Sequence, residues 1–246
     1  VGGHVRTVTS AAAKWQESII SFSARISRPG IEANRLAASD RTKPGTGIVE
    51  MSTTLIRAEV PISDEVMEDN VAGTNLVASL ERLIADRFGF DIEDLFVNGD
   101  TSFTDGSASD IAWYTLREGW FEQARQGKPG HAGNPISAAA LGKDYQEIFR
   151  QMLQTMPYRF LRNIEADGRF YVPKRVEQEY RDILSSRGTP LGDLSLQGTT
   201  ELRYQGILIL GVPSIRISSA NTAPFLLTNK NNLYAGYHRA MKFETW

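Results

Sequence analysis

The side chains that most often bind metals or move protons are few in this chain and lie far apart in the sequence. The three histidines, His4, His131 and His238, have no second ligand at the spacing of a zinc site. We therefore interpret each of them as a surface or packing residue. The chain has no cysteine, which excludes disulfides, thiolate metal sites and a cysteine nucleophile. This absence is typical of a reducing compartment.

Carboxylates occur side by side in pairs such as Asp64–Glu65 and Glu93–Asp94. Neighbouring residues on a helix point about 100° apart, so neither pair converges on one substrate as acid–base catalysis requires. The Asp-rich stretch at 98–110 is superficially similar to a calcium loop, but Thr101 and Phe103 occupy positions that need oxygen ligands. The alternative that remains for this stretch is incidental binding of a cation. Neither a nucleophile elbow nor a phosphate loop is present. The sequence predicts no catalytic residue, no cofactor, no metal site and no enzymatic activity.

Charge is distributed unevenly along the chain, although the total is only −2. Between residues 61 and 100 there are ten acidic and two basic side chains, a net charge of −8. The stretch 28–47 is basic instead. Its basic residues are Arg28, Arg35, Arg41 and Lys43. The near-neutral total argues against a dedicated nucleic-acid binder. The two stretches predict attraction between a basic segment of one copy and an acidic body of another, with solvated surface charge as the alternative.

No apolar run approaches the ~20 residues that span a bilayer, and no secretory signal is visible, so we expect no membrane partner. The chain begins with Val1 rather than methionine. We therefore expect an upstream segment, either cleaved or missing from this sequence.

The basic stretch lies between two segments that alternate like strands. Ile20, Phe22 and Ile26 alternate with polar residues before it, and a second strand-like run covers 48–63. Hairpin loops rarely need twenty residues, so the pattern predicts a long two-stranded arm with a polar tip. The apolar phase shifts by one residue between Met51 and Ile56, which predicts a bulge or a sharp twist. Residues 1–17 read as an extended arm with one helical turn at 11–16.

The rest of the chain mixes helices and strands, so the predicted fold class is α+β. A short helix is expected at 63–72, and long helices at 74–96, 143–156 and 173–188, with loops at 98–110 and 127–135. Their core-facing residues are predicted to include Leu80, Leu83, Ile84, Tyr145, Phe149, Val176, Tyr180 and Ile183. Strands are expected at 169–172, 201–204, 207–211, 214–218, 224–228, 232–238 and 240–246.

The order of these parts resembles the tailed-bacteriophage major capsid proteins of the Hong Kong 97 type, a fold shared with encapsulin shells. The arm ends in "AEVPISDEVMEDN" and leads into "NLVASLERLIADRFGFDIEDLFVNGD", which is similar to the spine helix of that family. The segments "RFYVPKRVEQEYRDILSSRGTPLGD", "ELRYQGILILGVPSI" and "LLTNKNNLYAGYHRAMKFETW" are similar to its middle strand–helix unit, a later strand and the closing segment. The likeness spans nearly all of residues 18–246.

The resemblance implies four parts of the subunit: an N-terminal arm at 1–17, an E-loop hairpin at 18–60, a peripheral domain at 61–139 and 226–246, and an axial domain at 140–225. The basic residues of the stretch 28–47 would lie at the E-loop tip, where they contact a neighbouring subunit. An upstream scaffolding segment would be removed during maturation.

The resemblance also implies a structural function: self-assembly into pentamers and hexamers of an icosahedral virion shell that encloses double-stranded DNA. Partners would be many copies of the chain, scaffolding, portal and cement proteins, and DNA bound non-specifically on the inner face. Assembly would take place in the host cytoplasm. Two alternatives remain open at this point: an encapsulin-type compartment, and an unrelated α+β enzyme with a site assembled from distant residues.

Overall fold

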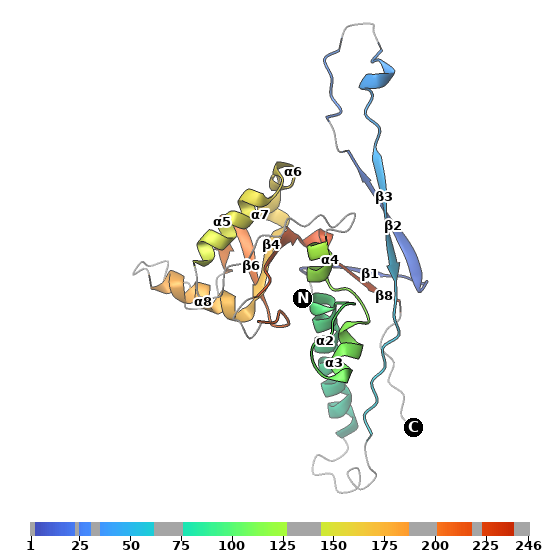
Figure 1. Cartoon of the computed structure of the whole chain (residues 1–246), viewed down its shortest axis with the longest axis vertical. Helices are drawn as coiled ribbons and strands as arrows, with labels where there is room; N and C mark the ends of the chain where they lie inside the picture. Colours follow the sequence, from blue (N-terminus) through green and yellow to red (C-terminus); the bar gives the residue numbers. More distant parts are fainter. Residues whose placement is uncertain are drawn as a thin grey trace. The chain divides into compact units, whose positions relative to one another are not determined.

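The computed structural model describes residues 3–22, 25–30, 35–61, 76–126, 144–186, 201–217 and 223–238. These residues form a mixture of helices and strands, so the predicted α+β class is confirmed (Figure 1). The chain divides into two compact units. The larger comprises Val1–Val8, Ile56–Ala235 and Lys242–Trp246, and the smaller comprises Thr9–Leu55 and Gly236–Met241.

The larger unit contains a four-stranded sheet with the strand order β5–β6–β4–β7. The strands are β4 (Gly168–Pro173), β5 (Arg203–Tyr204), β6 (Ile207–Val212) and β7 (Leu226–Asn229). β4 and β6 are parallel, whereas β7 is antiparallel to β4 and β5 is antiparallel to β6. Gln205 and Gly206 form the two-residue loop between β5 and β6, with φ values of 48° and 83°. Glycine adopts this left-handed conformation without steric cost, which favours the tight hairpin.

Both faces of the central strand β4 are covered, which explains its almost continuous apolar sequence. The helices that lie beside the sheet are α5 (Tyr145–Thr155) and α8 (Lys174–Ser185) (Figure 1). Phe149 of α5 is 0% exposed, and its ring centroid lies 4.8 Å from that of Phe170 and 5.4 Å from that of Tyr180. Tyr171 points to the other face and joins a second buried cluster with Val97 of helix α2.

Helix α2 (Leu76–Asn98) runs unbroken through Gly89, in agreement with the helix predicted at 74–96. Two short helices follow it, α3 (Ala108–Tyr114) and α4 (Trp120–Gln126). The backbones on either side of α3 approach closely, because the Gly119 N–H donates to the Gly99 carbonyl oxygen at 2.7 Å. A Cβ on Gly119 would lie 2.7 Å from the Val97 carbonyl oxygen, so no larger residue fits without backbone movement.

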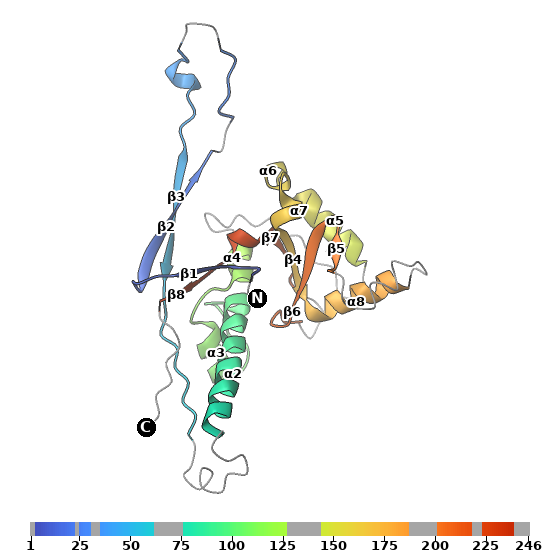
Figure 2. The same cartoon turned by 180° about the vertical axis from the view of Figure 1, so that it is seen from behind.

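The smaller unit contains the predicted arm as an antiparallel ribbon of two strands (Figure 2). The strands are β2 (Lys14–Ser21) and β3 (Gly45–Ser52), paired from Lys14 opposite Ser52 to Ser21 opposite Gly45. The predicted strand boundaries were wrong: β2 includes residues assigned to a helical turn, and residues 25–27 and 53–61 are not strand. The next pair would place Pro44 opposite Phe22, and proline has no N–H to continue the ladder.

The strand expected at 214–218 is also not formed over its described residues 214–217. The alternation there has another cause. Ile215 is buried in the second cluster, whereas the Ser214 hydroxyl and the Arg216 guanidinium contact carboxylates of α2. Strands β1 (Arg6–Thr9) and β8 (Tyr234–Tyr237) pair with each other. The helix expected at 63–72, the loop at 127–135 and the strand at 240–246 lie outside the described residues.

Candidate inter-subunit surface

One face of the β2–β3 ribbon is exposed along its whole length and includes two isoleucines. Gln16, Ser18 and Ile20 point to this face from β2, since side chains on a strand alternate. Ile48 is opposite Ser18, and Ile20 is its diagonal neighbour on the same face. Ile20 is 69% and Ile48 64% exposed. The ribbon thus presents paired apolar side chains to water.

The segment beyond the ribbon is held by a few polar contacts. It contains a 3-10 turn, η1 (Ala38–Asp40), where the Asp40 N–H donates to the Ala37 carbonyl oxygen at 3.0 Å (Figures 1 and 2). The Thr42 hydroxyl donates to the Arg25 carbonyl oxygen at 3.0 Å. The Arg41 Nε donates to the Leu36 carbonyl oxygen at 3.2 Å. We call residues 25–30 and 35–44 the tip segment.

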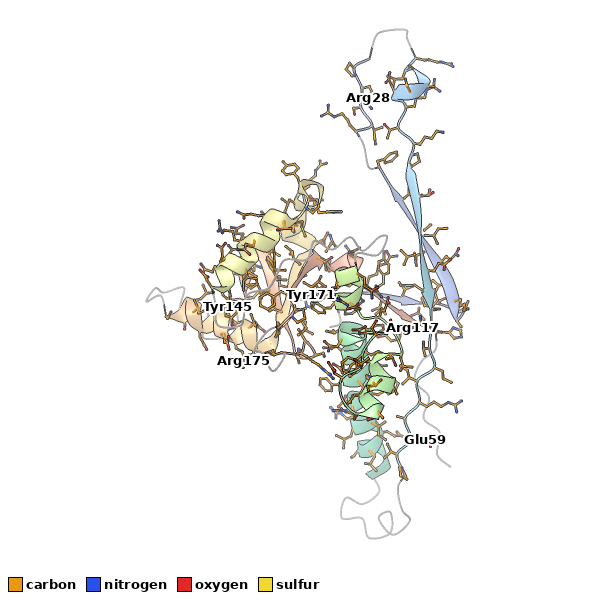
Figure 3. The ribbon with its side chains drawn as sticks, in the orientation of Figure 1. Arg28, Glu59, Arg117, Tyr145, Tyr171 and Arg175 are labelled. Atoms are coloured by element: carbon orange, nitrogen blue, oxygen red, sulfur yellow. The ribbon has the colours of Figure 1, made fainter. Side chains whose placement is uncertain are left out.

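All four basic residues that the sequence predicts as contact residues lie in the tip segment and are exposed. They are Arg28, Arg35, Arg41 and Lys43, of which Arg28 is labelled in Figure 3. Within the described ranges none of the four forms an ion pair. Phe22 and Ile26, also predicted to lie on the arm, are exposed too, and Ile26 belongs to the tip segment. The segment therefore combines unneutralised positive charge with apolar side chains.

Helix α2 has an exposed surface of the opposite charge. It contains five acidic and two basic residues. Leu83 and Phe90 are 64% and 60% exposed and are seven residues apart, so they lie on one face of the helix. Leu83 was expected in the core, and that expectation was wrong. Asp86, which is also exposed, lies near this face, and Arg87 pairs with Asp91 at 3.1 Å. This face is a second apolar surface with an acidic border.

The adjacent carboxylates Glu93 and Asp94 are engaged in structural contacts. Asp94 accepts hydrogen bonds from the Tyr114 hydroxyl and from Asn98 Nδ2, the latter at 2.6 Å, and pairs with Arg216 at 3.2 Å. The Arg216 guanidinium also lies 4.2 Å from the centroid of the Tyr114 ring. The Ser214 hydroxyl donates to Glu93 at 2.7 Å. These bonds connect α2 to α3 and to the segment after β6, which sequence reasoning missed because it assigned residues 214–218 to a strand.

The histidines are not brought together. Burial lowers the pKa of His4, and its carbonyl oxygen accepts a hydrogen bond of 2.6 Å from the Tyr171 hydroxyl, whose pKa burial raises to about 12. His238 Nδ1 lies 3.1 Å from the Ser10 carbonyl oxygen, and His131 is outside the described residues. In the part of the chain that the structure describes, no three His, Cys, Asp or Glu side chains form a group that could hold a metal ion. The same part contains no helix long and apolar enough to span a bilayer.

Comparison with curated proteins identifies a relative that covers most of the chain. The chain is similar to a Bacillus subtilis (strain 168) protein named "Putative prophage capsid protein YqbE". The two are 28% identical over 232 residues, which is 92% of this chain and 70% of the relative. No family model matches the chain. The similarity supports a phage capsid protein, which is consistent with the mixed helix and sheet structure and with a structural role.

Proposed function

We propose that this chain is a major capsid protein of the Hong Kong 97 type, which assembles into the pentamers and hexamers of an icosahedral shell around double-stranded phage DNA. The observation that carries the proposal is the exposed ribbon, with Ile20 and Ile48 in water and a basic tip segment beyond them. An isolated two-stranded ribbon is at best marginally stable in water. Contact with another copy would bury its apolar face and pair its charges.

A shell can be held together by many weak contacts instead of one strong contact. Apolar surface removed from water contributes roughly 25 cal/mol per Å², and the ordering of side chains offsets part of this gain. A subunit that contacts several neighbours through different surfaces is released only when all contacts break together. Head-to-tail contacts that close on themselves produce rings. Modest contacts of this kind can therefore form a stable shell.

In this proposal, residues 1–17 are the N-terminal arm and residues 18–60 the E-loop that lies on a neighbouring subunit. Residues 61–139 and 226–246 form the peripheral domain, and residues 140–225 form the axial domain. Tyr158 and Phe160 support a contact role for the axial part, because both are exposed on the short helix α6 (Tyr158–Leu161). They would contact neighbouring copies around the five- and sixfold axes.

The proposed partners are other copies of the chain, scaffolding, portal and cement proteins, and packaged DNA contacted without sequence preference. A net charge of −2 supports weak DNA contact, since phosphate attraction grows with clustered Lys and Arg. The proposal assigns the chain to the virion, without an enzymatic role or a cofactor.

Negative-stain microscopy of the expressed chain, combined with sedimentation velocity, tests the proposal. We expect closed shells of uniform size, and nuclease-resistant DNA inside particles recovered from phage-producing cells. A compact monomer at high protein concentration would contradict shell assembly. Shells that enclose a specific protein cargo instead of DNA would identify an encapsulin-type compartment.

A further inference from the structure

A tryptophan packs directly on a glycine at the root of the β2–β3 ribbon. Trp15 of β2 is paired with Met51 of β3, and Gly236 belongs to strand β8. A Cβ on Gly236 would lie 2.8 Å from Cη2 and 2.8 Å from Cζ2 of the Trp15 ring, and 3.7 Å from the Met51 sulfur. Side chains do not approach this closely, so the indole rests on the glycine Cα. We call Trp15, Met51 and Gly236 the root cluster.

Backbone hydrogen bonds surround the root cluster. The Ser10 N–H donates to the Tyr237 carbonyl oxygen at 2.9 Å, which ties the chain before β2 to β8. The Thr53 N–H donates to the Ala13 carbonyl oxygen at 2.9 Å, which closes the ribbon immediately after β3. The Trp15 indole N–H is buried and has no partner among the described residues. Phenylalanine at this position would therefore lose no hydrogen bond to the described residues.

We infer that the root cluster is a positioning device, which sets the angle at which the ribbon leaves strand β8. The cluster lies on the less exposed face of the ribbon, opposite to the face that contains Ile20 and Ile48. The inference rests on the proposed function in one respect: a fixed angle matters because the ribbon must reach a defined surface on another copy.

A small displacement at the root becomes a large one at the tip. A new Cβ on Gly236 must move the indole by roughly 0.6 Å to reach an ordinary contact of 3.4 Å. The strands of the ribbon are about 4.8 Å apart, and the ribbon extends about 20 Å from Trp15 to Ser21 at about 3.4 Å per residue. If the ribbon tilts about its root by the ratio of 0.6 Å to the strand spacing, its far end moves by about 2.5 Å.

Spin labels measure this movement, and the absence of native cysteine allows labels at chosen sites alone. One label replaces Gly30 in the tip segment and the other replaces the exposed Thr9, the last residue of β1, which pairs with β8 and belongs to the same compact unit as the ribbon. The labelled chain is diluted into excess unlabelled chain, and the distance distribution is recorded by pulsed electron resonance. The compared variants are Gly236→Ala, Trp15→Phe, the combination of both, and Gly89→Ala as a control at an open helix position.

The distance between the labels changes by no more than the tip moves, so we expect each single root variant to shift the mean distance by up to about 2.5 Å or to broaden the distribution by a similar amount. Phenylalanine lacks the two ring atoms nearest Gly236, so the double variant refills the vacated space and returns toward the wild-type distance. Gly89→Ala should leave the distance unchanged. Unchanged distances in both single variants, or a double variant whose shift is the sum of the two, would overturn the inference. Particle images distinguish the two proposals. If the root variants shift the distance but the wild-type chain forms no shells, only the proposed function is contradicted. If the wild-type chain forms normal shells but the root variants leave the distance unshifted, only the positioning role of the root cluster is contradicted.

Discussion

Replacing Ile20 and Ile48 with threonine should weaken assembly while leaving the folded subunit intact. Threonine keeps the β-branched shape that strands favour, so the change removes mainly apolar surface. Full burial of an isoleucine side chain contributes about 1.5–3 kcal/mol. At exposed fractions of 69% and 64%, about two thirds of that gain is still available to each residue, or about 2–4 kcal/mol for the pair. One contact per ribbon would then lose a factor of about 30 to 1,000 in its association constant.

Light scattering at increasing protein concentration measures this loss as a rise in the concentration at which particles first form. Thermal unfolding of unassembled subunits gives the parallel readout, and we expect the double variant to lie within about 0.5 kcal/mol of the wild type. Thr46→Ser is the matched control, because Thr46 is exposed on the same face opposite Ile20. The reasoning is refuted if the double variant assembles at the wild-type concentration, or if the isolated subunit is destabilised as strongly as assembly is.

Three further outcomes are expected. Replacing the four basic residues of the tip segment with glutamate should reduce shell yield at low salt and leave the subunit folded. Sedimentation measures the yield, and a variant yield equal to that of the wild type at every salt concentration would count against charge attraction between copies. Phe149→Ala should cost about 3–5 kcal/mol in the free energy of unfolding, read from urea denaturation, because it empties the centre of an aromatic cluster. The hydrogen bond from the Tyr145 hydroxyl and the charge of Arg175 lower the pKa of Glu179 from its ordinary 4.5. The ionised Glu179 therefore stabilises the fold above pH 4.5, and this contribution is lost as the pH falls through the lowered pKa. The Glu179→Gln variant should have a smaller free energy of unfolding than the wild type at neutral pH, and the two values should converge in acid. A difference in the free energy of unfolding that stays constant with pH would contradict this assignment.

The helices that cover the sheet could be predicted because their apolar residues recur at helical spacing. Tyr145, Phe149, Val176 and Tyr180 are buried as that spacing indicated. Ile183 of α8 satisfies the same spacing and was predicted to face the core, but its exposed fraction is 41%. Periodicity identifies one face of a helix, whereas the width of the covered stripe depends on what packs against it.

The existence of a two-stranded arm could be predicted from the sequence, but the residues at which its strands begin and end could not. The alternation around Ile20 continues past the end of β2, since side-chain pattern does not report whether a partner strand can donate hydrogen bonds. Pro44 was the available signal for that end. The root cluster had no signal in the sequence, because Gly236 is separated from Trp15 by more than two hundred residues.

Intermolecular cross-linking tests the central claim, that the ribbon lies on another copy of the chain. A photoreactive amino acid is placed at Ile48, and isotopically heavy and light chains are mixed before assembly and irradiation. Mass spectrometry of the digested particles should find heavy–light peptide pairs that join the ribbon to a second chain. Cross-links confined to peptides of the same isotope, at concentrations where particles form, would show that the ribbon contacts only its own subunit.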